Sequence, residues 1–394
     1  MPHHPARRPP PRVLSAPRRI LLLTASYGSG HSFVARTLAE QFREAGAEPT
    51  VVDHFRDLVH PAFDRWSRAL YYSVLRRAPV LWGAAYWLSD QISVSSPLLA
   101  GVNRLGMRKL RRLIAALRPA QVVSVHPTPV AALSALRARG VPIPPHTTVF
   151  TDFVAHTQWI HPDVDRYCVP ADEIAHDLIA RGVPRNRVVV TGIPVAPDFR
   201  QAAEHASARL ALGLSPRLPV LLFMDGSGGG FGRLEDATRT LLETEEPLQA
   251  LIVTGREEAL EARLRTLAAA SPSRIKVFGY VDNVRQLMAA ADFLVTKAGG
   301  LTLGEALAAE LPVICFGSLP GQEVRNERFA AMAGVALVAS SEAQLHRVIV
   351  AALRDPVLLR NMRERFRLYR RPDAARTIVD LVLGGKGVAR ELAS

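Results

Sequence analysis

RILLLT at residues 19–24 is a short apolar run, and ASYGSGH at residues 25–31 follows it directly. Apolar residues then recur at helical spacing from Ser32 to Ala45. This order predicts a buried strand, a tight loop containing Gly28 and Gly30, and a helix. Such a unit opens a doubly wound parallel sheet, and its loop lies at the edge of the sheet where ligands bind.

Further apolar runs alternate with helical patterns in two series. The first series predicts strands at Thr50–Val52, Gln121–Val125, Thr147–Thr151, Arg166–Val169 and Val188–Thr191. The second predicts strands at Pro219–Met224, Gln249–Thr254, Lys276–Phe278, Phe293–Thr296 and Val313–Phe316. A glycine-rich turn follows the strand at residues 19–24, which begins the first series, and another follows the strand at residues 219–224, which begins the second. We therefore expect an α/β protein with two Rossmann-like, doubly wound parallel-sheet domains that face each other across a cleft.

The length of 394 residues, with 48% apolar residues, is sufficient for two hydrophobic cores. Residues 1–17 are rich in Pro, Arg and His and contain no signal-like apolar core, so we expect a disordered basic arm. The expected domains are residues 18–196 and 197–365. The last stretch, 366–394, is expected to form a helix that packs back toward the first domain.

Charge, cysteine usage and the length of apolar runs restrict the class of protein. A formal charge of +13 favours anionic partners such as phospholipids, nucleotide phosphates or nucleic acid. No nucleic-acid-binding motif accompanies the charge, so nucleic acid is not an expected partner. Cys168 and Cys315 lie far apart, which argues against a disulfide framework and fits a reducing cytosol. No apolar run approaches the ~18 residues that cross a bilayer, so any membrane contact is expected to be peripheral.

TKAGGLTLGE at residues 296–305 is the most specific segment. It places Lys297 and two glycines at the end of a strand, before a helix expected to begin near Thr302, and this arrangement suits a diphosphate. The structural alternative is a capping box, because Thr302 and Glu305 have that spacing. PGQEVRN at residues 320–326 favours the ligand-binding interpretation, since its amide and carboxylate side chains suit sugar hydroxyls.

The first glycine loop offers a candidate general base. Gly28 and Gly30 allow backbone N–H groups to approach a diphosphate, although a tight turn with a surface histidine is the alternative. A neutral imidazole at the positive end of a helix suits proton abstraction. His31 is therefore a candidate for that role.

Three of the four tryptophans and three of the seven tyrosines lie between residues 66 and 87, interleaved with arginines. This mixture is typical of a bilayer interface, and the alternative is ordinary helices with solvated arginines. A second basic stretch follows at residues 104–118, where each charge contributes about 1 kcal/mol beside an anionic leaflet. The residues expected to contact the membrane or acceptor are Trp66, Arg76, Arg77, Trp82, Trp87, Arg108, Lys109 and Arg111.

These segments together resemble glycosyltransferases of the GT-B fold, specifically the monogalactosyldiacylglycerol synthase and processive diacylglycerol glucosyltransferase family. The peptidoglycan transferase that glycosylates lipid I is a more distant relative. The resemblance covers about residues 18–383. Its most specific matches are GSGH at 28–31, TDFVAH at 151–156, Trp159 with His161-Pro162, TGIP at 191–194, and the segments around Lys297 and Gln322.

The resemblance implies an inverting enzyme that transfers galactose or glucose from a UDP-sugar to the hydroxyl of diacylglycerol. The enzyme would act peripherally at the cytoplasmic side of the cell membrane, on an anionic phospholipid surface. The first domain would take the acceptor and the membrane, and the second domain would take the UDP-sugar.

The same resemblance assigns roles to individual residues. The backbone at Val281 would pair with uracil, Glu305 would bind the ribose hydroxyls, and Thr302 with the Gly299-Gly300 loop would hold the diphosphate. Gln322 and Glu323 would contact the sugar. The other residues implied in nucleotide-sugar binding are Gly28, Gly30, Gly226, Ser227, Gly228, Thr254, Gly255, Phe278, Lys297 and Leu301.

A lipid hydroxyl is a poor nucleophile at neutral pH, so transfer requires a positioned base. The resemblance places TDFVAH near the acceptor, which makes His31 and His156 rival candidates, with Asp152 as an orienting partner. Turn formation by Asp152 and a structural role for His156 are the alternatives. Lys297 and backbone N–H groups can stabilise the leaving diphosphate, and the histidines lack the spacing of a zinc site, so no obligatory metal or other cofactor is expected.

Other functions remain open. One is transfer of N-acetylglucosamine to a polyprenyl-linked acceptor, another is epimerisation of a UDP-sugar, and a third is a non-catalytic UDP-sugar-binding membrane protein. TDFVAH argues against the first two, and the presence of His31, Asp152 and His156 argues against the third. The sequence leaves open which hexose is transferred, the acyl chains, processivity, activation by anionic lipids and the oligomeric state.

Overall fold

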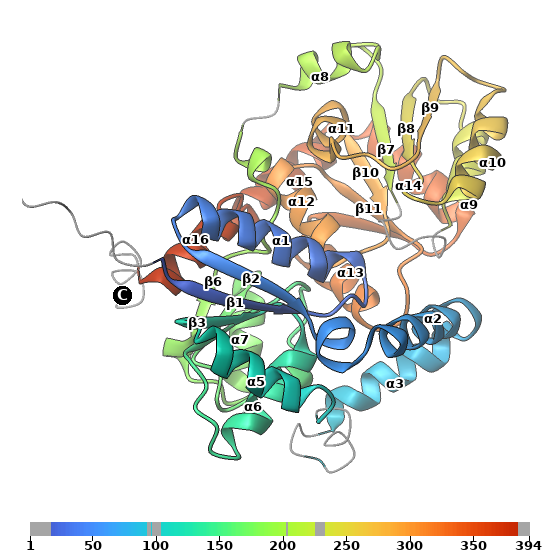
Figure 1. Ribbon diagram of the computed structural model, residues 1–394. Coiled ribbons are helices and arrows are strands. Elements are labelled where there is room, and N and C mark those ends of the chain that lie inside the picture. Colours follow the sequence, from blue (N-terminus) through green and yellow to red (C-terminus); the bar gives the residue numbers. More distant parts are fainter. Residues whose placement is uncertain (1–16, 93–95, 97–103, 202–203, 225–232, 385–394) are drawn as a thin grey trace, which may run out of the picture.

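The computed structural model describes residues 17–92, 96, 104–201, 204–224 and 233–384. Two six-stranded sheets, all of whose strand pairs are parallel, form the centres of two domains (Figure 1). The expected pair of doubly wound parallel sheets is therefore confirmed. Residues 1–16 of the expected basic arm lie outside the described residues, as do Gly226, Ser227 and Gly228.

The first sheet has the strand order β2-β1-β3-β4-β5-β6. Its strands are β1 (Arg19–Thr24), β2 (Glu48–Asp53), β3 (Gln121–Ser124), β4 (His146–Val149), β5 (Arg166–Val169) and β6 (Val188–Val190). Successive side chains of β1 alternate between two hydrophobic clusters, with Ile20 and Leu22 in one and Leu21 and Leu23 in the other. Both faces of the sheet are therefore covered, which explains why β1 reads as a continuous apolar run.

Four helices supply the covering layers of this sheet. α1 (Ser29–Glu44) and α7 (Asp172–Ala180) contribute to one cluster, and α5 (Met107–Leu117) and α6 (Pro127–Arg137) contribute to the other. α1 begins at Ser29, three residues earlier than the apolar pattern predicts. His31 consequently lies in the first turn of the helix that follows β1.

The second sheet has the order β12-β11-β10-β7-β8-β9, which is the dinucleotide-binding strand order. Its strands are β7 (Val220–Met224), β8 (Gln249–Val253), β9 (Ile275–Phe278), β10 (Phe293–Thr296), β11 (Val313–Phe316) and β12 (Ala336–Ala339). The helices of this domain are α8 (His205–Ala211), α9 (Leu234–Glu243), α10 (Glu258–Ala268), α11 (Val284–Ala290), α12 (Gly300–Ala309), α13 (Gln322–Met332) and α14 (Glu342–Arg354).

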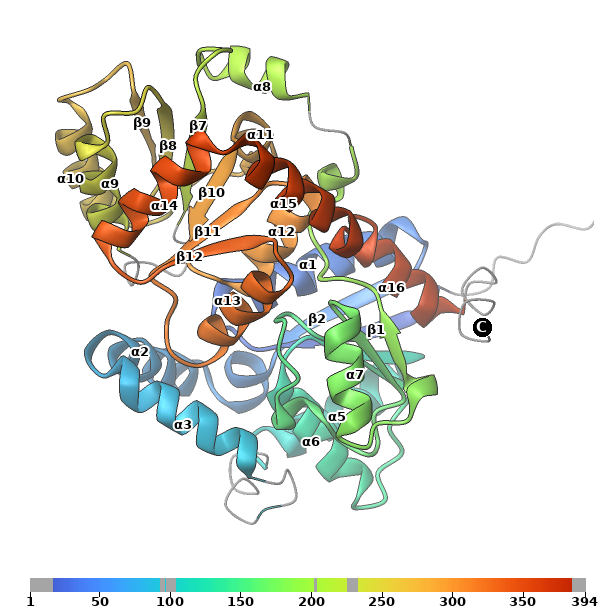
Figure 2. The ribbon, with the colours of Figure 1, turned by 180° about the vertical axis from the view of Figure 1, so that it is seen from behind.

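Two helices project from the first domain alongside the second (Figures 1 and 2). They are α2 (Pro61–Arg77) and α3 (Pro79–Gln91), which follow a π-helical turn at His54–Val59. Each begins with a proline at its first position, where the missing N–H has no intrahelical partner to lose. α3 packs against the second domain so closely that a Cβ on Gly83 would lie 2.6 Å from the Cβ of Pro320.

The C-terminal helices return to the first domain. α15 (Pro356–Tyr369) runs along the second domain, and α16 (Ala374–Leu383) packs against α1 (Figure 2). The guanidinium of Arg166, at the start of β5, donates to the carbonyl oxygen of Leu381 at 2.9 Å. The end of the described chain is thus attached to the first domain.

Candidate active site

A cavity of about 360 Å³ lies between the two domains at the carboxyl ends of the central strands. Both domains and the segment that joins them contribute to its walls. In parallel α/β sheets this edge is where ligands bind. The residues expected in the site that line the cavity are Gly28, Gly30, His31, Trp82, Asp152, Gly255, Val281, Lys297, Gly299, Gly300, Leu301, Thr302, Glu305, Gln322 and Glu323.

Other residues expected in the site lie elsewhere among the described residues. Thr254 is buried and joins β8 to β9, because its N–H donates to the carbonyl oxygen of Phe278 at 2.9 Å. His156 is not among the described residues that line the cavity. Of the residues expected at the membrane, only Trp82 lines the cavity.

The ring of His31 is held in one tautomer by its surroundings. Its Nδ1 lies 2.8 Å from the carbonyl oxygen of Val125 and 2.9 Å from the hydroxyl of Thr151. A carbonyl oxygen only accepts, so Nδ1 carries the proton in the neutral ring. Nε2 is then the unprotonated nitrogen, which has the lone pair that a general base needs.

Burial keeps the His31 ring neutral. Desolvation lowers its pKa from the ordinary value, against the opposing effects of the Asp152 charge and the Val125 carbonyl. His126 packs edge-on against it, with 4.7 Å between the ring centroids. At neutral pH, His31 is therefore an unprotonated base at a cavity wall.

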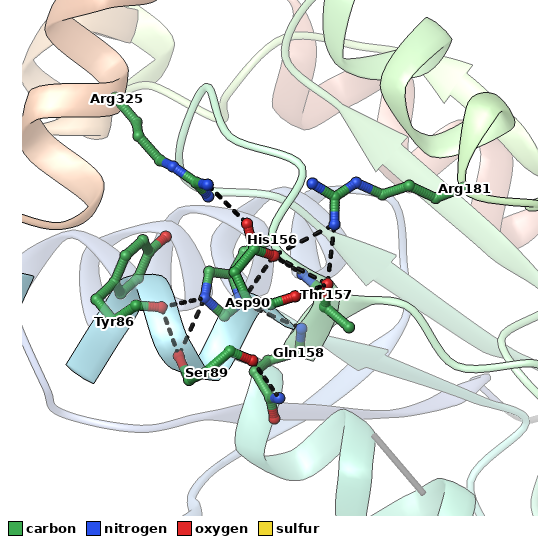
Figure 3. Close-up of polar contacts among 8 residues, drawn as sticks. All are labelled: Tyr86, Ser89, Asp90, His156, Thr157, Gln158, Arg181 and Arg325. Atoms are coloured by element: carbon green, nitrogen blue, oxygen red, sulfur yellow. Dashed lines mark hydrogen bonds and ion pairs between the residues drawn. The ribbon is translucent and has the colours of Figure 1, made fainter. Parts of the chain in front are cut away.

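His156 has neither nitrogen available (Figure 3). Its Nδ1 accepts from the backbone N–H of Gln158 at 3.1 Å, and its Nε2 lies 3.2 Å from both the Tyr86 carbonyl oxygen and the Ser89 hydroxyl. Its exposed fraction is 4%, and burial lowers its pKa. The geometry ties His156 to α3 and favours His31 as the base.

Asp152 connects the domains at the cavity. Its Oδ1 accepts from the amide of Asn326 at 2.9 Å, and the same amide nitrogen donates to the carbonyl oxygen of Ala298. The amide oxygen of Asn326 accepts from the backbone N–H of Phe153 at 2.8 Å. Asn326 is fully buried and uses both ends of its side chain. The sequence pattern placed Asn326 in a polar cluster but did not identify it as a site residue.

The N-terminus of α12 faces the first domain, and no side chain among the described residues caps it. The N-cap is Gly299, and the helix begins at Gly300, two residues before Thr302, so the capping-box alternative does not apply. A Cβ on Gly300 would lie 2.0 Å from the carbonyl oxygen of Thr151, so only glycine fits there. The bare N–H groups of this turn are available to an anion.

Two charged side chains from the second domain meet beside this turn. The Nζ of Lys297 lies 3.0 Å from the Oε1 of Glu323. The other oxygen of Glu323 accepts from the backbone N–H of Leu319 at 2.9 Å. Lys297 is thereby oriented at the end of β10, next to the α12 N-terminus.

Glu305 is a buried carboxyl on the cavity side of α12. Its exposed fraction is 7%, and burial, followed by the charge of Asp198, raises its pKa to about 8. Glu305 and Val281 both line the cavity. Hydroxyl donors from a ligand would offset the cost of burying this carboxyl.

An apolar and basic surface lies on α2 and α3, away from the cavity; we call it the aromatic patch. Its apolar members and their exposed fractions are Trp66 63%, Leu70 49%, Val80 76%, Leu81 69%, Trp87 60% and Leu88 53%. Arg76 and Arg77, at the corner between the helices, are exposed. On α5, Arg108, Lys109 and Arg111 are exposed as well.

Comparison with known proteins follows the division of the chain. Residues 31–195 match the family described as monogalactosyldiacylglycerol (MGDG) synthase, and residues 230–371 match glycosyl transferases group 1. The chain is 31% identical over 365 residues to the processive diacylglycerol beta-glucosyltransferase of Bacillus cereus (strain AH187), covering 93% of each chain. The protein of the same name from Bacillus anthracis (strain A0248) has the same identity and coverage.

Solved structures share the fold. Acinetobacter baumannii MurG superimposes with a TM-score of 0.64 at 18% identity, covering 93% of this chain and 100% of that chain. The UDP complex of S. aureus MnaA has a TM-score of 0.60 at 16% identity, covering 95% and 97%. At these identities the likeness concerns the fold alone. The full-length identity to the Bacillus proteins is stronger evidence, and it shows that the chain belongs to the monogalactosyldiacylglycerol synthase and processive diacylglycerol glucosyltransferase family of GT-B glycosyltransferases.

Proposed function

We propose that the protein transfers a hexose from UDP-glucose or UDP-galactose to the hydroxyl of diacylglycerol, with inversion at the anomeric carbon. One structural relationship carries this proposal: an unprotonated histidine lies across a cavity from an uncapped helix N-terminus. A Cβ on Gly30 would lie 3.5 Å from the Cβ of Leu301, so the helix start that contains His31 faces the start of α12. A base and an anion site therefore meet within one cavity.

The donor is held by the second domain in this proposal. The diphosphate lies at the N-terminus of α12, where bare N–H groups and the charge of Lys297 offset its charge. Glu305 accepts from the ribose hydroxyls, the backbone at Val281 pairs with the uracil, and Gln322 with Glu323 contacts the hexose. These assignments rest on family membership together with the position of each residue in the cavity wall.

The chemistry is a single displacement. The acceptor oxygen attacks the anomeric carbon, its proton passes to the Nε2 of His31, and the bond to the UDP oxygen breaks. The imidazolium that forms donates through Nδ1 to the carbonyl oxygen of Val125, and the negative charge of Asp152 favours it. Lys297 and the α12 N–H groups stabilise the departing diphosphate, so the proposed reaction requires no metal.

The acceptor reaches the cavity from a membrane surface. Large exposed apolar side chains in such number mark an interaction surface. With the arginines beside them, the apolar members of the aromatic patch match the interface of an anionic bilayer. Among the described residues, no helix has both the length and the apolarity to cross a membrane. We propose peripheral attachment at the cytoplasmic side, where both UDP-sugars and anionic phospholipids occur.

A donor-by-lipid assay tests this function. The protein is incubated with radiolabelled UDP-glucose, UDP-galactose or UDP-N-acetylglucosamine and vesicles that contain diacylglycerol or a polyprenyl phosphate lipid. The expected result is labelled glycosyldiacylglycerol from one or both UDP-hexoses. Label in the polyprenyl lipid alone, or a new UDP-sugar without a lipid product, would replace the proposal.

A further inference from the structure

Two buried polar atoms in the cavity wall have no hydrogen-bond partner within the described residues. One is the indole N–H of Trp82, on α3 of the first domain, and the other is the amide oxygen of Gln322, at the start of α13 in the second domain. Both side chains line the cavity. Buried polar groups are normally satisfied, so a lone donor and a lone acceptor in a ligand cavity point to a missing ligand group.

The backbone brings the two side chains together. The ring of Trp82 lies over Gly321, because a Cβ on that glycine would be 3.0 Å from the Nε1 of Trp82. Gly321 has φ of 108°, which favours glycine, and it directly precedes Gln322. Trp82 and the residue that leads into α13 are therefore in contact across the domain boundary.

Tyr71, on α2, fixes the amide of Gln322. Burial raises the pKa of the Tyr71 phenol and the neighbouring Gln322 side chain opposes that rise, while the Tyr71 ring packs edge-on against Trp82 with 5.0 Å between centroids. Since the amide oxygen has no partner within the described part of the chain, the amide nitrogen is the group that faces the phenol. Tyr71 therefore leaves the amide oxygen directed to another donor.

A hydroxyl group matches this pair, because it accepts one hydrogen bond and donates another. We propose that the indole N–H of Trp82 and the amide oxygen of Gln322 together bind one hydroxyl of the transferred hexose, with Tyr71 as a positioning residue. This inference rests on the proposed function and identifies residues that recognise the transferred sugar. The hexose is favoured over the glycerol because Gln322 is adjacent to Glu323, which orients the Lys297 of the diphosphate site.

The arrangement makes sugar recognition depend on contact between the two domains. The donor of the pair belongs to the first domain and the acceptor to the second, so both are presented only while α3 packs on the loop at Pro320. A sugar that lacks the matching hydroxyl leaves two buried polar groups unsatisfied. A polar site penalises such an analogue more than an apolar pocket penalises a lost methyl group.

Deoxy analogues of the donor test the proposal. In the wild type, one deoxy analogue of UDP-glucose or UDP-galactose is expected to show a kcat/KM at least about tenfold lower than its parent. Trp82→Phe keeps an aromatic ring but removes the N–H, so it should lower kcat/KM for the parent and abolish most of the penalty for that analogue. The ratios for the other deoxy analogues should not change. Tyr71→Phe should give an intermediate loss of the same ratio, which a merely structural change would not produce.

Three measurements separate the outcomes. Trp87→Phe, which alters an exposed indole on the same helix, should leave every ratio at its wild-type value. Calorimetric binding of UDP-hexose without lipid distinguishes a sugar hydroxyl from a glycerol hydroxyl, and Trp82→Phe should weaken UDP-hexose but not UDP. This binding measurement tests the inference even if no lipid is glycosylated. A failure to glycosylate any lipid would overturn the proposed function but not the inference. Unchanged ratios and unchanged UDP-hexose binding in Trp82→Phe would overturn the inference.

Discussion

Asp90, in the last turn of α3, and Arg325, in the first turn of α13, form an ion pair of 2.7 Å between the two domains (Figure 3). The Asp90 side chain is almost fully buried, and its other oxygen accepts from the backbone N–H of Thr157 at 2.7 Å and from Arg181 at 3.2 Å. Burial would raise the pKa of Asp90, but the bonds from Thr157 and Arg325 and the nearby His156 hold it well below the usual range. α3, which carries part of the aromatic patch, is thus attached to α13, the helix that begins with Gln322.

We expect Asp90→Asn to lower the free energy of unfolding by about 2 kcal/mol, because it removes the buried negative charge that pairs with Arg325 and Arg181. About a third of the Arg325 side chain is exposed, so its coupling to Asp90 is expected near 1 kcal/mol in a double-mutant cycle with Arg325→Gln. Urea denaturation measures both. Because the pKa of Asp90 is depressed on folding, its contribution is present above the ordinary aspartate range and is lost as pH falls below it. Additive effects of the two substitutions would show that the pair does not link the domains.

His156→Ala should destabilise the protein without removing the catalytic base. Its Nε2 holds the loop after β4 to Tyr86 and Ser89 of α3, and its Nδ1 accepts from Gln158 within that loop, so we expect a loss of about 2 kcal/mol in the free energy of unfolding. Burial lowers the pKa of His156 on folding, and this part of the stability is present above pH 6.5 and lost as pH falls below it. The acidic limb of the kcat/KM profile should remain in the variant. Loss of that limb would make His156 the base.

Glu305→Gln should separate stability from nucleotide binding. The folded-state pKa of Glu305, about 8, exceeds its unfolded value. The contribution of Glu305 to the free energy of unfolding is therefore fully present below the unfolded pKa and is lost as pH rises through 8. The ligand-free variant should therefore have a higher Tm than the wild type at pH 9. Calorimetry should show UDP binding weakened about tenfold, because the amide NH₂ of glutamine cannot accept a hydrogen bond from a ribose hydroxyl where a carboxyl oxygen can. A variant that binds UDP as tightly as the wild type would refute the ribose assignment.

Trp66→Ser and Trp87→Ser should weaken attachment to vesicles that contain anionic phospholipid. Each exposed indole is expected to contribute about tenfold in partition coefficient, and the remaining binding should fall with salt because of the neighbouring arginines. Vesicle sedimentation measures this. Leu210→Ser is the matched control, because Leu210 is 81% exposed on α8, on the far side of the second domain (Figure 1). Equal losses from all three variants would exclude a specific surface on α2 and α3.

The apolar runs of the sequence predict every strand of the two described sheets except β12. Its segment, Ala336–Ala339, is short, contains two alanines and has no distinctive pattern. Propensity likewise places the start of α12 near Thr302, whereas close contact with Thr151 requires glycine at 300 and the helix starts there. Local pattern cannot reveal a requirement that comes from the opposite domain.

The same limit applies to individual site residues. His31 and Lys297 follow strands and could be expected at the cavity from order alone. Trp82 is grouped with the exposed tryptophans by composition, yet it lines the cavity, since only tertiary packing distinguishes one face of α3 from the other. His156 and Asn326 also depend on contacts between distant segments, which sequence spacing does not encode.

The pH dependence of hexose transfer to diacylglycerol, measured for the wild type and His31→Gln with a saturating UDP-hexose, tests the account most directly. Because burial lowers the pKa of His31, the wild-type rate should be flat at neutral pH and fall only below pH 6.5. His31→Gln should reduce kcat about 10²–10⁴-fold, lose that acidic limb and still bind UDP as the wild type does. A variant that retains both the rate and the limb, or a wild type that forms no glycosyldiacylglycerol, would contradict the account.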